Sequence, residues 1–78
     1  MPMDSAKAIW EVTAGLIPGQ VDHQHTQRFG VTSAEYEEHG LRLLLERWHY
    51  AVAYAEYLQL LCAHGREVNW VRLDFVWP

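Results

Sequence analysis

The segment LRLLLERWHYAVAYAEYLQLLC, residues 41–62, carries two apolar stripes at helical spacing. The first stripe consists of Leu41, Leu44, Trp48, Ala51, Ala55, Leu58 and Cys62. The second, beside it, consists of Leu43, Tyr50, Tyr54, Tyr57 and Leu61. A helix needs only one apolar stripe to cover one face of a sheet. The second stripe therefore predicts that this helix is buried on two sides.

The helix is expected to cover about residues 33–64. Ser33 is a suitable N-cap. The glutamates that follow it would lie in the first turn, where the positive end of the helix dipole stabilises negative charge. Gly65 is placed to end the helix, because glycine commonly occupies the first position beyond a helix. Gly40 marks either a bend or the boundary between a short helix and a long one.

Strands are expected on both sides of this helix. Residues 68–77 alternate between apolar and polar side chains, which is typical of a strand with one buried face. Residues 7–17 fit both a strand and a helix, but their β-forming residues around Trp10 and the turn signal at Pro18 and Gly19 favour a strand. Residues 18–32 are polar and are expected to form a loop, with Phe29 anchoring it to the core.

These elements predict one α+β domain over residues 1–78, with a long central helix on a small sheet. Two strands alone form an unstable sheet in water, and an apolar edge strand tends to pair. Both the small sheet and the second helical stripe are therefore expected to be completed by homodimerisation.

Charge and composition exclude several function classes. The net charge of −4 argues against a nucleic-acid binder. The most apolar segment, residues 48–63, is shorter than the roughly 20 residues that span a bilayer, and the N-terminus lacks a basic signal region. The single Cys62 excludes an internal disulfide framework, and it lies on an apolar stripe, as a core residue does. No glycine-rich cofactor loop is present, so we expect no cofactor. The lone thiol and the lack of an export signal favour a cytoplasmic protein.

Two histidine-containing patterns raise the question of metal binding or catalysis. His23 and His25 stand two residues apart and could begin a metal site, but three or four ligands are needed, so a solvated loop is the simpler interpretation. Glu46 and His49 form half of a di-iron helix motif. The simpler interpretation of that pair is a hydrogen bond between neighbouring turns at the rim of the helix.

Aromatic side chains are the remaining candidates for function, because tyrosine and tryptophan concentrate at interfaces. The first hypothesis is a non-catalytic dimeric binding or adaptor protein, with Trp70 as the contact residue on an otherwise polar strand face. The alternative is a small hydrophobic ligand or a minimal enzyme site in a cleft between protomers. In that case the lining and polar groups would be Tyr50, Tyr54, Tyr57, Glu46 and His49.

The segment NWVRLDFVW, residues 69–77, together with Trp48, resembles the tails of small uncharacterised bacterial proteins of the kind carried on mobile gene cassettes. The resemblance implies a small bacterial cytoplasmic protein. It assigns no activity, cofactor or site residue to this chain.

Overall fold

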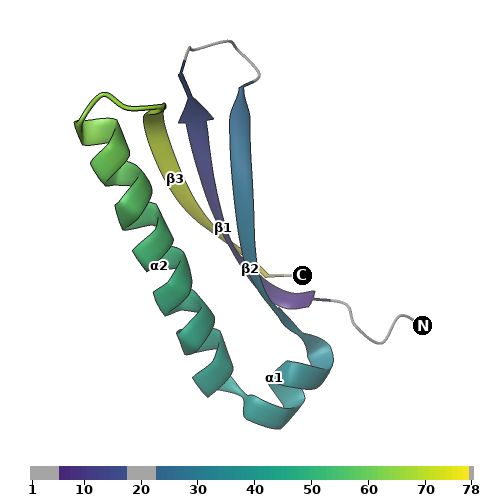
Figure 1. The fold of residues 1–78 in the computed structure, drawn as a ribbon. Helices are drawn as coiled ribbons and strands as arrows, with labels where there is room; N and C mark the ends of the chain where they lie inside the picture. The colour runs from purple at the N-terminus through teal and green to yellow at the C-terminus, as the bar shows by residue number, and fades with distance from the viewer. Residues whose placement is uncertain (1–5, 18–22, 78) are drawn as a thin grey trace.

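Three antiparallel strands and one long helix make up the fold (Figure 1). The computed structural model describes residues 6–17 and 23–77. The elements, in chain order, are β1 (Ala6–Leu16), β2 (Gln24–Thr32), α1 (Ser33–His39), α2 (Leu41–Ala63) and β3 (Val68–Val76). The sheet order is β2-β1-β3, and β1 pairs antiparallel with both neighbours. The predicted α+β class is confirmed.

The strand interpretation of the first segment is confirmed, because β1 is the central strand of the sheet. Its period-two face, which carries Trp10, Val12 and Ala14, packs towards α2. The predicted C-terminal strand is also present, as β3.

The predicted loop over residues 18–32 is wrong for residues 24–32, which form β2. Residues 18–22 lie outside the described part of the chain. Most of β2 is polar because it is an edge strand whose side chains are largely exposed. Phe29 and Val31 face the helix opposite Trp10 and Ala8, so the predicted anchoring of Phe29 to the core is confirmed. The strand owes its conformation to its pairing with β1 more than to its own apolar pattern.

Thr32 caps α1, and not the predicted Ser33, which is the first residue of the helix. The Thr32 hydroxyl accepts a hydrogen bond from the Glu35 backbone N–H at 3.1 Å, and the Glu35 carboxylate accepts one from the Thr32 backbone N–H at 3.0 Å. This reciprocal pair is a capping box. The bond from the Thr32 backbone holds the pKa of the Glu35 carboxyl below its ordinary value.

Gly40 divides the helical region into α1 and α2, as one of the two sequence interpretations predicted. Its backbone has φ 62° and ψ −145°, a region that is essentially restricted to glycine. A Cβ atom at this position would meet nothing within 4 Å, so the requirement for glycine comes from the backbone alone.

Replacing Gly40 with alanine is therefore expected to destabilise the protein by about 1–3 kcal/mol. Helix propensity alone predicts the opposite sign, because alanine is favoured over glycine within helices. Urea unfolding of the variant measures the difference. Ala53, which is exposed in the middle of α2, provides the control. Ala53→Gly should cost about 1 kcal/mol through propensity. A Gly40→Ala protein more stable than wild type would contradict this explanation of the helix boundary.

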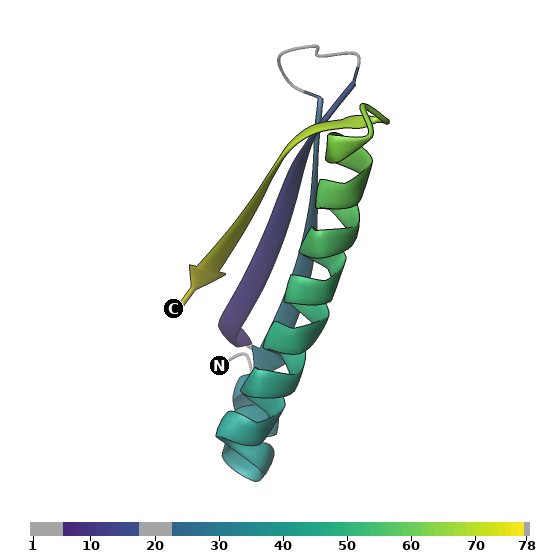
Figure 2. The ribbon, with the colours of Figure 1, turned by 90° about the vertical axis from the view of Figure 1, so that its left-hand side faces the viewer.

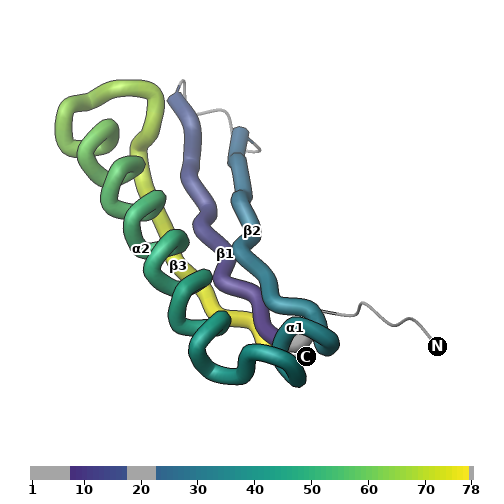
Figure 3. The backbone as a smooth tube through the Cα atoms, turned by 60° about the horizontal axis from the view of Figure 1, so that its bottom comes forward, coloured from purple at the N-terminus to yellow at the C-terminus, as the bar shows by residue number. Residues whose placement is uncertain are grey.

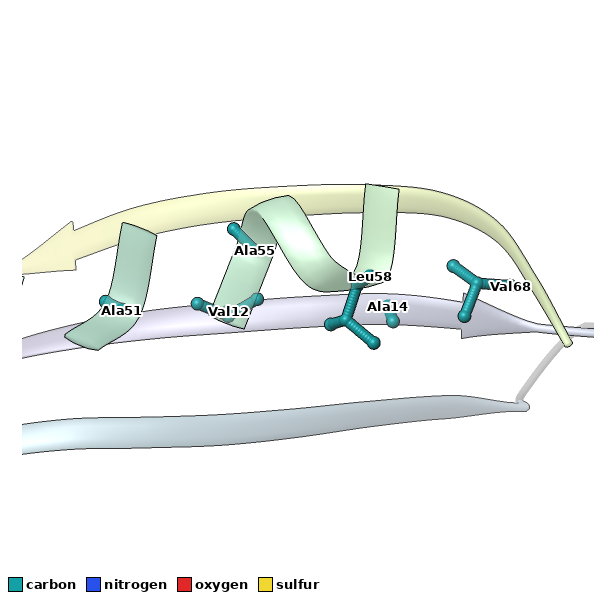
Figure 4. Close-up of a cluster of buried hydrophobic side chains, with 6 residues drawn as sticks. All are labelled: Val12, Ala14, Ala51, Ala55, Leu58 and Val68. Carbon is teal, nitrogen blue, oxygen red and sulfur yellow. The ribbon is translucent and has the colours of Figure 1, made fainter. Parts of the chain in front are cut away.

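The core lies between α2 and one face of the sheet, as the close-up in Figure 4 shows. Its buried members are Val12, Ala14, Ala51, Ala55, Leu58 and Val68. The helix contributes only three of these, all from its first apolar stripe. Within one chain the sheet covers a single face of α2, so the burial of the helix on two sides, which was expected to come from homodimerisation, stays a prediction.

The helix runs along the sheet, while the C-terminal half of β3 curves away from it (Figure 2). In Figure 3, β3 runs behind α2 and beside β1. Among the described residues, no helix combines the length and apolarity needed to cross a bilayer. The separation of α2 and β3 leaves apolar side chains of both elements uncovered.

Candidate functional site: an apolar groove beside strand β3

A groove of about 480 Å³ opens between the N-terminal half of α2 and the sheet. Its lining is entirely apolar and consists of Trp10, Leu41, Leu44, Leu45 and Trp48. We call these five residues the aromatic groove. Trp10 comes from the central strand β1, and the other four residues follow one flank of α2 at helical spacing. Leu41 and Leu45 are 69% and 55% exposed, so the groove is open to solvent.

Aromatic rings continue the groove along β3. The ring centroids of Trp10 and Phe75 are 4.2 Å apart, and those of Phe75 and Trp77 are 6.1 Å apart. Trp48 contacts Trp10 from the helix side at 6.4 Å. Tyr36 of α1 contacts Trp77 at 6.1 Å, edge to face. The groove and the end of β3 therefore form one continuous aromatic surface.

Part of this surface consists of three solvent-exposed residues from β3 and the position that follows it. Leu73, Phe75 and Trp77 are 38%, 44% and 54% exposed. Leu73 and Phe75 pair with Val12 and Trp10 of β1, so their side chains lie on the helix side of the sheet. They are uncovered because β3 has diverged from α2 at this point (Figure 2).

The indole nitrogen of Trp10 is buried and has no hydrogen-bond partner among the described residues. Leaving such a donor unpaired costs about 1–3 kcal/mol. The ring is held by its aromatic neighbours rather than by a polar contact, so the floor of the groove is specified by packing.

The tyrosines predicted to line a cleft lie on the opposite flank of α2. Tyr54 packs on Phe29 of β2, with ring centroids 6.0 Å apart. Tyr50 and Tyr57 follow the same stripe and are 55% and 57% exposed. None of the three is among the residues that line the aromatic groove.

The structure does not bring Glu46 and His49 together in a site. The Glu46 carboxylate accepts a hydrogen bond from Arg47 at 2.9 Å, and His49 is exposed beside the Trp48 ring. Glu46 borders a second, polar depression of about 340 Å³ near Glu35, whose lining does not include His49. The two side chains therefore do not converge on a cavity as an acid and base acting on one substrate would.

Trp70 lies on the sheet face directed away from α2, as the alternation of the segment predicted. Its indole ring covers Gly15 so closely that a Cβ atom there would lie 2.0 Å from the ring nitrogen. The Arg72 guanidinium lies over the Trp70 ring, 5.6 Å from its centroid. The Trp70 ring is half-buried and already occupied by these neighbours, which weakens its candidacy as the leading contact residue.

The rest of this face, which we call the outer face, carries paired polar groups. Arg28 donates to Glu11 at 2.9 Å, and Arg72 donates to Asp74 at 2.7 Å. The nearly buried hydroxyl of Thr13 is hydrogen-bonded to that of Thr26 on β2. The outer face therefore has the character of a solvated surface, in contrast to the aromatic groove.

The histidines considered as metal ligands and the single cysteine do not form a site among the described residues. His23 precedes β2 and His25 is its second residue, and both side chains are exposed. No group of three or more histidine, cysteine, aspartate or glutamate side chains that could hold a metal occurs in residues 6–17 and 23–77. Cys62 is partly buried against the core cluster, as its position on the first stripe predicted.

Sequence analysis missed the aromatic groove as a site. Leu41, Leu44 and Trp48 belong to the first stripe, which was assigned to the core, and Leu45 was placed in neither stripe. Trp10 belongs to the buried face of β1. The available signal was the excess of aromatic residues over what a small core can bury. No family model, curated protein or solved structure matches this chain.

Proposed function

We propose that the protein is a non-catalytic binding module that acts as a homodimer, with the aromatic groove buried against a second copy of the chain. The observation that supports the proposal is the continuous aromatic surface formed by the groove and the exposed end of β3. Contiguous apolar patches of this kind mark interaction sites on soluble proteins.

The exposed area is appropriate for an interface. Leu41, Leu45, Leu73, Phe75 and Trp77 are each between 38% and 69% exposed. Given the size of such side chains, they present on the order of 500 Å². A standard interface buries about 800 Å² on each partner, so these residues alone supply more than half.

A binding role is favoured over catalysis by the distribution of polar groups. The lining of the aromatic groove contains no acid, base or nucleophile. The polar depression near Glu35 contains charged groups that are paired with each other, such as Glu46 with Arg47. The bacterial cytoplasmic location stays a prediction.

The solution mass, measured by light scattering behind a sizing column at several concentrations, tests the proposal. A mass near twice 9.1 kDa that persists on dilution is the expected result. A monomer at all concentrations would contradict the homodimer.

The volume of the groove favours a second candidate function, the binding of a small hydrophobic ligand. About 480 Å³ lies within the range of roughly 300–1,000 Å³ that small-molecule sites occupy. This candidate places the ligand against Trp10 and Trp48 rather than against the three tyrosines. The small-ligand function predicts a monomer in solution, with a groove that binds an apolar dye. The mass measurement therefore distinguishes this function from the homodimeric binding module.

A further inference from the structure

The two edges of the sheet differ in their readiness to accept another strand. The edge strand β2 carries polar side chains on both faces, including Gln27 and His25 on the helix side, and these oppose pairing. The other edge strand, β3, presents Val71, Leu73 and Phe75 on the helix side and has no proline or lysine. Of the two edge strands, β3 is therefore the one better suited to pair with a strand of another chain.

The sequence of β3 and its C-terminal extension is self-complementary about Leu73. In an antiparallel pair centred on Leu73, each residue lies opposite the one at equal distance on the other side of it. Val71 then faces the partner's Phe75 on the helix side. Arg72 faces the partner's Asp74 on the outer face. Apolar groups thus meet apolar groups, and each arginine meets an aspartate.

On the outer face, Asp74 accepts a hydrogen bond from Arg72 of its own chain at 2.7 Å, and this pairing places a second arginine beside it. Glu11 on β1 lies directly opposite Asp74 on β3, and two like charges in cross-strand positions are unfavourable. Arg28 neutralises Glu11 from the β2 side. The partner's Arg72 would flank Asp74 from the open side, giving a row that runs arginine, glutamate, aspartate, arginine across the sheet.

We infer that two copies of this chain pair through antiparallel β3 strands, with Leu73 on the two-fold axis. This inference rests on the proposed homodimer and specifies its interface. The result is one six-stranded sheet with both α2 helices on the same side, because the two-fold axis is perpendicular to the sheet. Leu73 and Phe75 are covered by their counterparts, and the aromatic grooves open towards the interface.

Other registers that keep the helices on the same side fit the sequence less well. Centring the pair on Arg72 places the two arginines opposite each other, and centring it on Asp74 does the same for the two aspartates. Centring it on Val71 leaves Phe75 beyond the paired strands. Leu73 is the centre that combines unlike charges with matched apolar residues.

A charge-exchange experiment tests the register. Arg72→Asp places two aspartates of each chain opposite two of the partner, and Asp74→Arg does the same with arginines. Each variant alone is expected to dimerise about tenfold or more weakly than wild type, since like charges repel across paired strands. An equimolar mixture of the two should form a heterodimer, because every cross-strand pair then becomes an arginine with an aspartate. Native mass spectrometry of the mixture measures the heterodimer fraction.

A cross-linking experiment provides a second readout that needs no charge change. Directly opposed residues of antiparallel strands have Cα atoms about 4.5–5.5 Å apart, within the range of a disulfide. In a Cys62→Ala background, Leu73→Cys is expected to oxidise to a covalent dimer. Val76→Cys is the matched control, because in this register Val76 faces the partner's Trp70 and the two thiols stay far apart.

The outcomes separate this inference from the proposed function. A monomeric wild-type protein would overturn both. A wild-type dimer whose variants show no preference for the heterodimer would overturn the pairing of the β3 strands. A dimer in which Val76→Cys cross-links and Leu73→Cys does not would overturn the register. Both results would leave the homodimer standing. Circular dichroism spectra of each variant verify that it is folded before its mass is compared.

Discussion

Replacing Leu45 with glutamate is expected to abolish the dimer while leaving the fold of the single chain intact. Leu45 is 55% exposed in one chain and lines the aromatic groove, so a carboxylate there stays in water when the protein is monomeric. In the dimer the same carboxylate would be desolvated against apolar groups. Apolar side chains that are desolvated in an interface can contribute about 2 kcal/mol or more, so the substitution is expected to weaken association roughly 30-fold or further.

Leu60→Glu is the matched control for this substitution. Leu60 lies on the same helix and is 59% exposed, but it is not among the residues of the aromatic groove. The control should therefore have the wild-type mass. Light scattering of both variants at one concentration gives the comparison. If Leu60→Glu dissociated the dimer and Leu45→Glu did not, the interface would lie on another flank of α2.

Replacing Leu58 with alanine is expected to lower the free energy of unfolding by about 3 kcal/mol. Leu58 is 7% exposed and reaches from α2 towards β1, beside Ala14 (Figure 4). It is the largest side chain of the buried cluster, whose other members are valines and alanines, so truncating it removes buried apolar contacts and leaves a cavity. A loss of this size corresponds to a melting temperature lower by about 12–24 °C in a domain of this length.

Leu60 again supplies the comparison, two residues further along the helix. Leu60→Ala removes the same atoms from an exposed position and should change the stability by about 0.5 kcal/mol or less. Thermal unfolding followed by circular dichroism, at a concentration where both variants have the same oligomeric state, measures the difference. Equal losses at the two positions would show that the assignment of the buried face of α2 is wrong.

Local pattern was sufficient to predict the elements whose own residues carry a strong period. The two apolar stripes of residues 41–62 predicted α2, and the alternation of residues 68–77 predicted β3. Gly40 and Gly65 both have positive φ angles and stand at helix ends, where the sequence placed a boundary and an end. These features depend on neighbours along the chain, which a sequence displays directly.

The polar strand β2 could not be recognised in the same way. Its conformation depends on hydrogen bonds to β1 and on contacts such as that between Thr13 and Thr26, which are distant in the chain. An edge strand exposed on much of both faces need not alternate in polarity, so its sequence resembles that of a loop. The cap at Thr32, the last residue of this strand, was misplaced by one residue for the same reason.

By itself the sequence determined one α+β domain, a long amphipathic helix, the faces of two strands and an excess of aromatic side chains. Only the tertiary structure decided where that excess lies. The helix has one sheet to cover, and β3 curves away from it, so Trp10, Trp48 and Phe75 meet at an open groove rather than in a closed core. The direction in which a twisted edge strand leaves a helix is set by long-range packing, and no local period in the sequence records it.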